Sequence, residues 1–151
     1  MTNLEYKTHF TLWAIAKAPL IIGCDLASIK NIDLEILKNT EIIAINQDPL
    51  GRQAMCIKSC SWLSFHFLHL SPQIWITSLV DSYAVVIMNW NFFPLIWVNI
   101  KLGELGIPAG TYTVRDLWLH QDIGTLNNML NIGTVKYHDC LLYTSPSPRD
   151  S

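Results

Sequence analysis

The stretch that decides the fold runs from Glu5 to Gly51: EYKTHFTLWAIAKAPLIIGCDL (5–26) and, after a short gap, LEILKNTEIIAINQDPLG (34–51). The chain enters it through Thr2-Asn3-Leu4-Glu5, which has the form of a capping box at the start of a helix. The apolar spacing that follows predicts a helix packed on a sheet and stopped by Pro19. Leu20–Gly23 is a continuous apolar run, typical of a parallel strand buried on both faces.

The residues on either side of Gly51 predict two different architectures. Two short helices are expected before it, Leu34–Lys38 capped by Asp33 and Glu41–Asn46 capped by Thr40. Helices around a buried strand form an α/β pattern, and such a strand needs neighbours that this chain does not supply. After it, short runs separated by turn residues predict an antiparallel sandwich. The expected strands are Ala54–Lys58, Leu63–Leu70, Ile74–Leu79, Tyr83–Trp90, Ile96–Leu102, Thr111–Trp118 and Asn131–Tyr137.

Several blocks resemble the α-galactosidases (melibiases) of glycoside hydrolase family 27. THFTLWAIAKAPLIIGCDL (8–26) and IIAINQDPLG (42–51) match that family nearly residue by residue, and Thr113–Trp118 with His120 resembles its VRDLWxH strand. The resemblance implies the last βα unit of a (β/α)8 TIM barrel over residues 1–51 and a Greek-key antiparallel β-sandwich over residues 52–139. It also implies a retaining exo-α-galactosidase that hydrolyses terminal α-D-galactosides without cofactor or metal, with a homodimer as the expected state of the intact enzyme.

The catalytic carboxylates that the resemblance implies do not occur in this chain. Retaining glycosidases need two carboxyl groups about 5 Å apart, and neither of the family's motifs, YxKxDxC and RxSxDI, is present. Asp25 is the best candidate from the residues alone, because it follows Leu20–Gly23 and catalytic groups lie at the C-terminal ends of barrel strands. An Asp here is also a favoured helix cap, and the family's catalytic aspartates lie elsewhere. The chain alone is therefore predicted to be inactive.

Other polar residues have structural interpretations beside catalytic ones. Asp48, before Pro49, is a turn-former. Asp116 and His120 could suggest a hydrolase triad, but Gly-x-Ser-x-Gly is absent, so His120 is expected at the surface of a continuing strand. Two alternatives to the α-galactosidase hypothesis remain: a non-catalytic β-sandwich module for sugar binding or packing and, within the family, an α-N-acetylgalactosaminidase.

Composition limits the possible partners and compartment. A net charge of −2 with scattered Lys residues argues against nucleic acid, and no apolar run is long enough to span a membrane. The four cysteines fit an oxidising compartment, so a disulfide is expected, although Cys56 and Cys60 with His66 and His69 could also be drawn as a zinc site. The resemblance implies an extracellular or lysosomal/vacuolar parent enzyme; this chain shows no signal peptide.

The end of the chain departs from the family. Thr144–Ser151 is rich in Ser and Pro and has no apolar residue to offset the entropy of ordering. Together with Cys140–Tyr143 it resembles translated ligation-adapter sequence from a cDNA library. Residues 140–151 are therefore predicted to be a disordered, non-native and dispensable tail.

Overall fold

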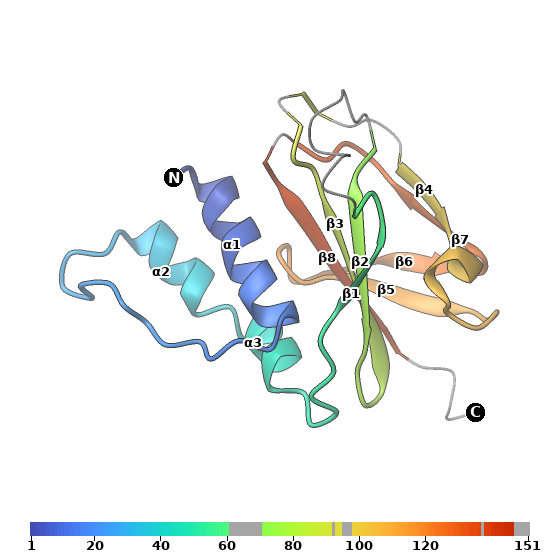
Figure 1. Cartoon of the computed structure of the whole chain (residues 1–151), viewed down its shortest axis with the longest axis horizontal. Coiled ribbons are helices and arrows are strands. Elements are labelled where there is room, and N and C mark those ends of the chain that lie inside the picture. The colour runs from blue at the N-terminus through green and yellow to red at the C-terminus, as the bar shows by residue number, and fades with distance from the viewer. Residues whose placement is uncertain (61–70, 92, 95–97, 137, 147–151) are drawn as a thin grey trace.

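The chain folds into three layers, with helices on one side of a large antiparallel sheet and a small sheet on the other (Figure 1). The structure is a computed structural model that describes residues 1–60, 71–91, 93–94, 98–136 and 138–146. The expected strand Leu63–Leu70 lies outside the described residues, as do residues 147–151. The antiparallel β-sandwich predicted from the turn spacing is confirmed.

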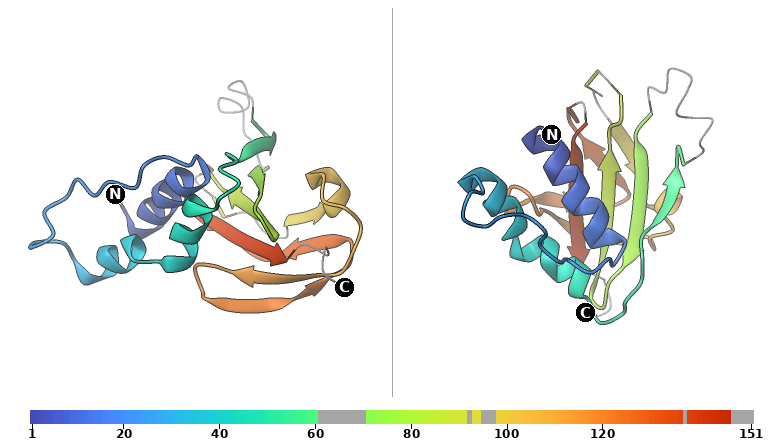
Figure 2. Two further views of the ribbon diagram at one scale, coloured as in Figure 1. Left: turned by 90° about the horizontal axis from the view of Figure 1, so that it is seen from below. Right: turned by 60° about the vertical axis from the view of Figure 1, so that its left-hand side comes forward.

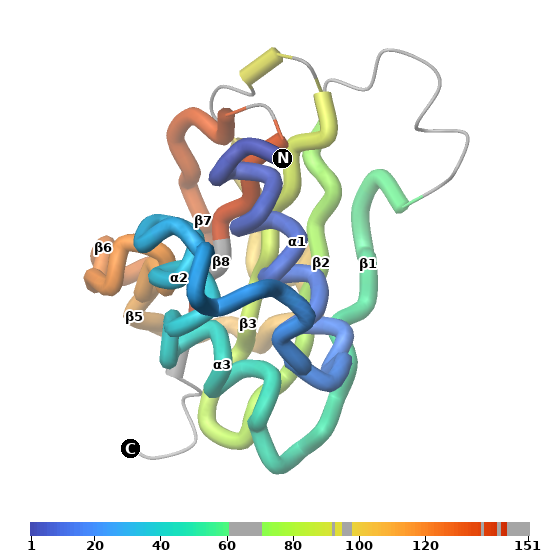
Figure 3. Tube along the Cα trace, turned by 90° about the vertical axis from the view of Figure 1, so that its left-hand side faces the viewer, coloured from blue at the N-terminus to red at the C-terminus, as the bar shows by residue number. Residues whose placement is uncertain are grey.

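Helix α1 (Asn3–Ile15) begins with the predicted capping box. The Thr2 hydroxyl accepts a hydrogen bond from the backbone N–H of Glu5 at 3.3 Å, and the Glu5 carboxylate accepts one from the N–H of Thr2 at 2.7 Å. The helix ends at Ile15, with Ala16 as its C-cap, before Pro19, and Lys17 turns the chain with a left-handed φ of 56°. Its buried face, which includes Phe10, Ala14 and Ile15, lies across the large sheet (Figure 3).

Helices α2 (Asn31–Leu37) and α3 (Thr40–Gln47) are present, but neither has the predicted cap. Helix α2 starts earlier than expected, at Asn31, so Asp33 lies in its first turn. Helix α3 is capped by Asn39, whose side-chain oxygen accepts hydrogen bonds from the N–H groups of Glu41 and Ile42, both at 3.1 Å. Asn is as good an N-cap as Asp and better than Thr, which explains the one-residue shift.

The predicted buried strand Leu20–Gly23 is not a strand. Ile21 is 80% exposed and Ile22 is 50% exposed, within a loop that joins α1 to α2. A strand forms only when a neighbouring backbone accepts hydrogen bonds from its N–H groups and donates hydrogen bonds to its C=O groups. No strand of the described residues pairs with this segment, so its apolar character does not give it strand structure.

Among the described residues, the large sheet has six strands in the order β1-β2-β3-β8-β5-β6, and the small sheet pairs β4 with β7. Every pairing between these described strands is antiparallel. The strands of the large sheet, in that order, are Met55–Lys58, Gln73–Ser78, Ser82–Met88, Cys140–Pro146, Tyr112–Asp116 and Gln121–Leu126. Those of the small sheet are Val98–Lys101 and Met129–Ile132, and a 3-10 helix, η2, spans Leu102–Leu105.

The prediction that residues 140–151 are disordered is wrong for residues 140–146, which form β8. This strand lies in the interior of the large sheet, with Val85 opposite Tyr143 on β3 and Arg115 opposite Thr144 on β5. Backbone pairing on both edges orders a segment whose composition alone offers little burial. Cys140 and Tyr143 are also buried, so the segment contributes to the core. Whether it is adapter-derived is not tested by the fold.

Strand β3 is buried on both faces, and its alternating side chains separate two cores. Val85 and Ile87 point into the core between the two sheets, with Ile100, Tyr112 and Leu130. Ala84, Val86 and Met88 point into the core beneath the helices. Figure 2 shows the helices on one face of the sheet and β4 with β7 on the opposite side. The helices therefore form one layer, which packs on the face of the large sheet opposite to the small sheet.

Candidate functional site

Asp25 lies in the exposed loop between α1 and α2. Its side-chain oxygen accepts a hydrogen bond from the N–H of Ala27 at 3.0 Å, and its carbonyl accepts from the hydroxyl of Ser28 at 3.4 Å. These are the contacts of a turn-forming Asp. The catalytic role of Asp25 remains a prediction made from the sequence.

An apolar cavity of about 310 Å³ lies beside this loop. Its walls are α1, the loop and α2, with Trp13, Leu20, Ile22 and Ile36 among the apolar residues and His9 and Asp33 as polar groups. The cavity is the space between the unpaired Leu20–Gly23 segment and the helices, so it belongs to the part of the chain that resembles a barrel.

The Asn-Gln-Asp-Pro motif of residues 46–49 joins the helical segment to the sandwich. Asn46 is buried, and its side-chain amide donates to the carbonyls of Trp13, Ala14 and Ala18 at 3.5, 3.4 and 2.9 Å. The carbonyls of Trp13 and Ala14 also accept from the backbone N–H groups of Ala18 and Lys17, at 3.1 and 3.2 Å, so Asn46 adds a side-chain donor to the turn that ends α1. Asp48 accepts from the N–H of Leu50 at 3.0 Å and of Val80 at 3.1 Å. The turn-forming role predicted for Asp48 thus includes a second contact, to the β2–β3 hairpin.

The VRDLWxH motif supplies the sandwich half of the junction. Arg115 on β5 contacts Glu41 on α3 through two hydrogen bonds, from Nε at 2.7 Å and from a terminal nitrogen at 2.9 Å. The same guanidinium contacts Asp122 on β6 at 3.0 Å. His120 contacts Glu41 through Nδ1 at 2.7 Å. This bidentate geometry is the strong form of a carboxylate–guanidinium contact.

Asp116 and His120 do not form a triad. Strand β5 ends at Asp116, because the Asp116 carboxylate accepts from the N–H groups of Trp118 and Leu119, both at 2.9 Å, and starts a turn. The strand predicted over Thr111–Trp118 therefore ends two residues early, while His120 is exposed as expected. His120 has a left-handed φ of 56° and faces Glu41 rather than Asp116.

A second set of contacts fixes α1 to the sandwich. The hydroxyl of Thr8 donates to the carbonyl of His138 at 3.0 Å, and Nδ1 of His138 lies 3.1 Å from the Glu5 carboxylate. The indole N–H of Trp118 donates to the hydroxyl of Thr11 at 3.2 Å. From the sequence, these residues were interpreted only as parts of a helix or of a strand. In the structure, their side chains form hydrogen bonds between α1 and the sandwich.

The electrostatics of the junction favour its charged forms. Hydrogen bonding from Arg115, followed by that from His120, holds the pKa of Glu41 below its usual value. Hydrogen bonding to Glu41 and then Asp122 raises the pKa of Arg115, which stays charged at all relevant pH values. The N–H of Thr2 and then His138 hold the pKa of Glu5 below its usual value. By contrast, burial raises the pKa of Cys140 to about 11, so this thiol is a neutral core group.

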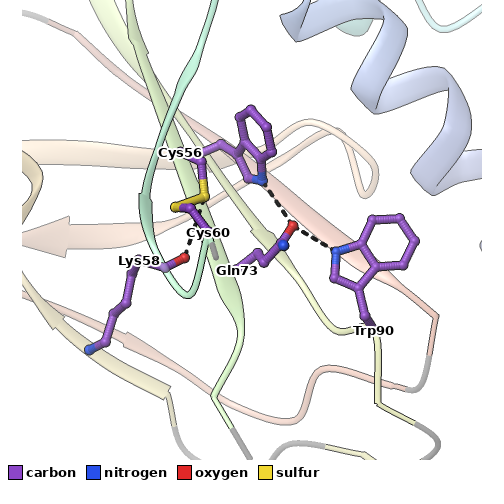
Figure 4. Close-up of a disulfide and its surroundings, with 6 residues drawn as sticks. Cys56, Lys58, Cys60, Gln73 and Trp90 are labelled. Carbon is purple, nitrogen blue, oxygen red and sulfur yellow. Dashed lines mark hydrogen bonds between the residues drawn. A yellow bond between two sulfur atoms is a disulfide. The ribbon is translucent and has the colours of Figure 1, made fainter. Parts of the chain in front are cut away.

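Cys56 and Cys60 form a disulfide at the edge strand β1 (Figure 4). The pairing resolves the alternatives left open by the sequence, since these sulfurs are bonded to each other. Nearby, the side-chain oxygen of Gln73 accepts from the indole N–H groups of Trp75 at 3.4 Å and Trp90 at 2.8 Å. His66 and His69 of the alternative zinc set lie outside the described residues.

The described part of the chain holds no group of three or more His, Cys, Asp or Glu side chains placed to bind a metal ion. Nor does any helix in it combine the length and the apolar character needed to cross a membrane.

Sequence reasoning missed the pairing of Arg115 with Glu41, which are 74 positions apart. It also missed the capping role of Asn46 and the contact between Glu5 and His138. The sequence does show that these polar residues occur within blocks that are otherwise apolar. This pattern marks the residues as unusual, but it does not identify the residues that they contact.

The chain matches two family profiles in adjacent segments. The profile described as Alpha galactosidase A matches residues 2–48, and the one described as Alpha galactosidase C-terminal beta sandwich domain matches residues 71–145. The second match includes most of β8. A helical segment matched by the first profile, packed on a sandwich matched by the second, places the chain in the class of proteins that these profiles describe.

Individual relatives agree with the profiles. Alpha-galactosidase 2 of Arabidopsis thaliana is 36% identical over 146 residues, and the α-galactosidase of Cyamopsis tetragonoloba is 34% identical over 145 residues. Each match covers 95% of this chain, but only 34% and 33% of the relative. α-Galactosidase I from Mortierella vinacea superposes with a TM-score of 0.81 at 27% identity, over 96% of this chain and 36% of that chain. This chain belongs to the α-galactosidase family, glycoside hydrolase family 27, and spans about a third of the length of its relatives.

Proposed function

We propose that the whole protein is a retaining exo-α-galactosidase and that this chain supplies the last βα unit of its barrel together with the sandwich. The junction carries this proposal, because the blocks that resemble the family are the ones that connect the two parts. Asn46 and Asp48 come from one block, and Arg115 and His120 come from another. The α-galactosidase names of the relatives support the substrate class, a terminal α-D-galactoside.

In this proposal, the two catalytic aspartates belong to a part of the barrel outside this chain. The chain has neither YxKxDxC nor RxSxDI, and a retaining reaction needs one carboxylate as nucleophile and another as acid and base. The residues of this chain then act by position: they complete the barrel and hold it on the sandwich. The proposed enzyme uses no cofactor and acts without nucleic acid or membrane, and a homodimer remains a prediction for it.

An extracellular or lysosomal/vacuolar location is part of the same proposal. The Cys56–Cys60 disulfide supports it, because disulfides persist in oxidising compartments and are rare where thiols are kept reduced.

The first experiment tests whether the chain alone is inactive. The 151-residue chain and its Asp25→Asn variant are expressed and assayed with p-nitrophenyl α-D-galactoside. We expect no turnover from either protein, because loss of a catalytic carboxylate removes a covalent or proton-transfer step. Turnover that Asp25→Asn abolishes would contradict the proposal, whereas equal turnover in both would indicate a contaminating enzyme.

The second experiment separates the clipped enzyme from a non-catalytic sandwich module. The transcript is extended upstream and read in frame. In-frame YxKxDxC-like and RxSxDI-like sequences support the enzyme, and an in-frame stop supports the module. If the motifs are present, the extended protein is assayed with α-galactoside and α-N-acetylgalactosaminide substrates. A clear preference for the second substrate would replace the α-galactosidase proposal with the related activity.

A further inference from the structure

An apolar part of the surface lies on the side of the helices that faces away from the sandwich. Tyr6 and Trp13 of α1 and Ile21 and Ile22 of the following loop are exposed, and all four line the cavity of about 310 Å³. These four side chains are called the open face below. Figure 1 shows the loop and α2 on the side of α1 opposite to the large sheet. Contiguous exposed apolar patches are uncommon on monomeric proteins and mark interaction surfaces.

Contacts within this chain hold the open face in position. Helix α1 is fixed to the sandwich by the hydrogen bonds of Thr8 and Thr11, and helix α3 is fixed by Glu41. The side-chain amide of Asn46 donates to the carbonyl of Ala18 at 2.9 Å, just before the loop begins. The helices and the start of the loop are therefore placed before any partner binds.

The Leu20–Gly23 segment presents backbone groups that a neighbouring strand can pair with. Among the described residues, its N–H groups make one backbone hydrogen bond, from Ile21 to the carbonyl of Pro19 at 2.9 Å. The segment is anchored before it at Ala18 and after it by the turn at Asp25. Apolar side chains and backbone groups open to pairing are what a strand buried on both faces offers to its neighbours.

The lengths of the relatives indicate which partner fits this surface. The chain covers 33% of the α-galactosidase of Cyamopsis tetragonoloba, and its sandwich matches a domain described as C-terminal. The rest of that relative therefore precedes the matched part. Residues 2–48, which carry the open face, match the profile described as Alpha galactosidase A rather than the sandwich profile. The fold to which the open face belongs thus continues upstream.

We propose that the open face binds the upstream barrel part of an α-galactosidase of this family as a separate chain, and that Leu20–Gly23 changes from a loop to a β-strand when this complex forms. The inference rests on the proposed function, because it takes the partner from the same family. It adds that the two parts associate without a covalent link and that the strand is ordered only on binding. A segment that becomes ordered on binding loses conformational entropy at that step, which burial of the open face offsets.

The test uses the α-galactosidase of Cyamopsis tetragonoloba, divided where its match to this chain begins. Its upstream part carries an affinity tag and is co-expressed with the full 151-residue chain. We expect the tagged part to retain the chain. Ile22→Asp should lower the retained amount at least about tenfold, because it places a charge against an apolar partner. The matched control Ile123→Asp, at a 47% exposed position of β6, should leave the amount unchanged.

Two additions keep the retention test decisive. Ile21→Asp, at the 80% exposed position next to Ile22, repeats the test if the first variant does not fold. The relative's own matched part is co-expressed in the same way for comparison. The inference is overturned if the chain is not retained, whether or not the relative's own part is. It is also overturned if the open-face variants are retained as well as Ile123→Asp.

Hydrogen exchange by mass spectrometry tests the change from loop to strand. Exchange over Leu20–Gly23 should be fast in the free chain and at least about tenfold slower in the complex. Equal exchange in the two samples would overturn the inference. Turnover of p-nitrophenyl α-D-galactoside by the complex reports the proposed function separately. Slow exchange without turnover supports the inference and counts against the proposed function, whereas turnover without slow exchange does the reverse.

A second copy of this chain is the competing occupant of the open face. Size-exclusion chromatography with light scattering gives the mass of the free chain, and we expect a monomer. A dimer in which Leu20–Gly23 exchanges slowly, and which Ile22→Asp dissociates, would assign the open face to a second copy and overturn the inference.

Discussion

Two apolar runs of this chain have nearly the same character and opposite fates. Leu20–Gly23 is an exposed loop, with Ile21 80% exposed, whereas Val85–Met88 lies in β3, where Val86 is fully buried. Strand β3 has β2 on one edge and β8 on the other, with the helices over one face and the small sheet over the other. Among the described strands, none pairs with Leu20–Gly23.

The difference shows that an apolar run makes a segment suitable for burial. Whether the segment is buried depends on the strands and apolar layers that surround it in the folded chain. A strand that is buried in the interior of a sheet needs partners for its backbone groups at both edges and apolar layers on both faces. Strand β3 receives one edge partner from β2 of the same hairpin, and the other edge partner, β8, comes from residues far away in the sequence. Leu20–Gly23 would receive them only from the rest of a barrel.

The largest effect is expected when β3 loses a partner strand, because it then lacks a neighbour at one edge, as Leu20–Gly23 lacks neighbours. If the chain is ended at Asp139, β8 is removed and β3 loses the neighbour at one of its edges. The sheet then separates into β1-β2-β3 and β5-β6, and we expect the sandwich not to fold, as measured by near-ultraviolet circular dichroism. A chain ended at Pro146 keeps β8 and should melt at the original temperature. A folded sandwich in the shorter chain would show that β8 is dispensable.

The second largest difference between the two apolar runs is expected when a charged residue is placed in each of them. Val85→Asp buries an unpaired carboxylate between the two sheets, where Val85 is 5% exposed, and should cost at least ~4 kcal/mol or prevent folding. The matched variant Ile22→Asp places the same carboxylate on a 50% exposed position and should change the free energy of unfolding by less than about 0.5 kcal/mol. Urea denaturation measures both. Similar losses in the two variants would mean that Leu20–Gly23 is buried in solution.

An intermediate effect is expected at Asn46, which holds the chain just before the exposed run. Its amide donates to the Ala18 carbonyl at 2.9 Å and to the carbonyls of Trp13 and Ala14. Asn46→Ala leaves these carbonyls without that donor, which should cost about 1–3 kcal/mol. Thermal unfolding measures the loss, and Thr40→Ala, at an exposed position of α3, serves as the control. An unchanged melting temperature in Asn46→Ala would show that water replaces the amide.

The smallest expected effect is that of Ile21→Ser, and hydrogen exchange of single backbone amides compares the two runs in the unmodified chain. In the unmodified chain, hydrogen exchange over Leu20–Gly23 should be close to that of an unstructured peptide, while β3 should be strongly protected. Ile21→Ser should change the free energy of unfolding by no more than about 0.5 kcal/mol while reducing aggregation, because it shortens an exposed apolar run. Strong protection over Leu20–Gly23 in a monomeric sample would contradict both expectations.

Much of the architecture could be predicted because its signals are local. The capping box of α1, the hairpin of β2 and β3, and the strand Met55–Lys58 follow from turn residues and alternation within a few positions. The family resemblance was confirmed by the profiles and relatives. These features need no knowledge of which segments meet in space.

The missed features depend on contacts between distant residues. Strand β6 is exposed along most of its length and carries a mixture of polar and apolar residues, so it shows no alternation until it pairs with β5. Strand β8 is ordered by β3 and β5, and the Ser- and Pro-rich composition around it suggested disorder. The bond between Glu41 and Arg115 likewise exists only after α3 has packed on the sheet. Sequence pattern alone cannot supply such pairings.

The interior position of β8 has a consequence for how the protein is made on the ribosome. β8 is the last described strand in sequence order, yet it lies between β3 and β5, which are translated before it. Until it emerges, the facing edges of both strands carry unpaired N–H and C=O groups and remain open to pairing with another nascent chain. The large sheet therefore closes only after translation has passed Pro146, and these two edges stay open until then.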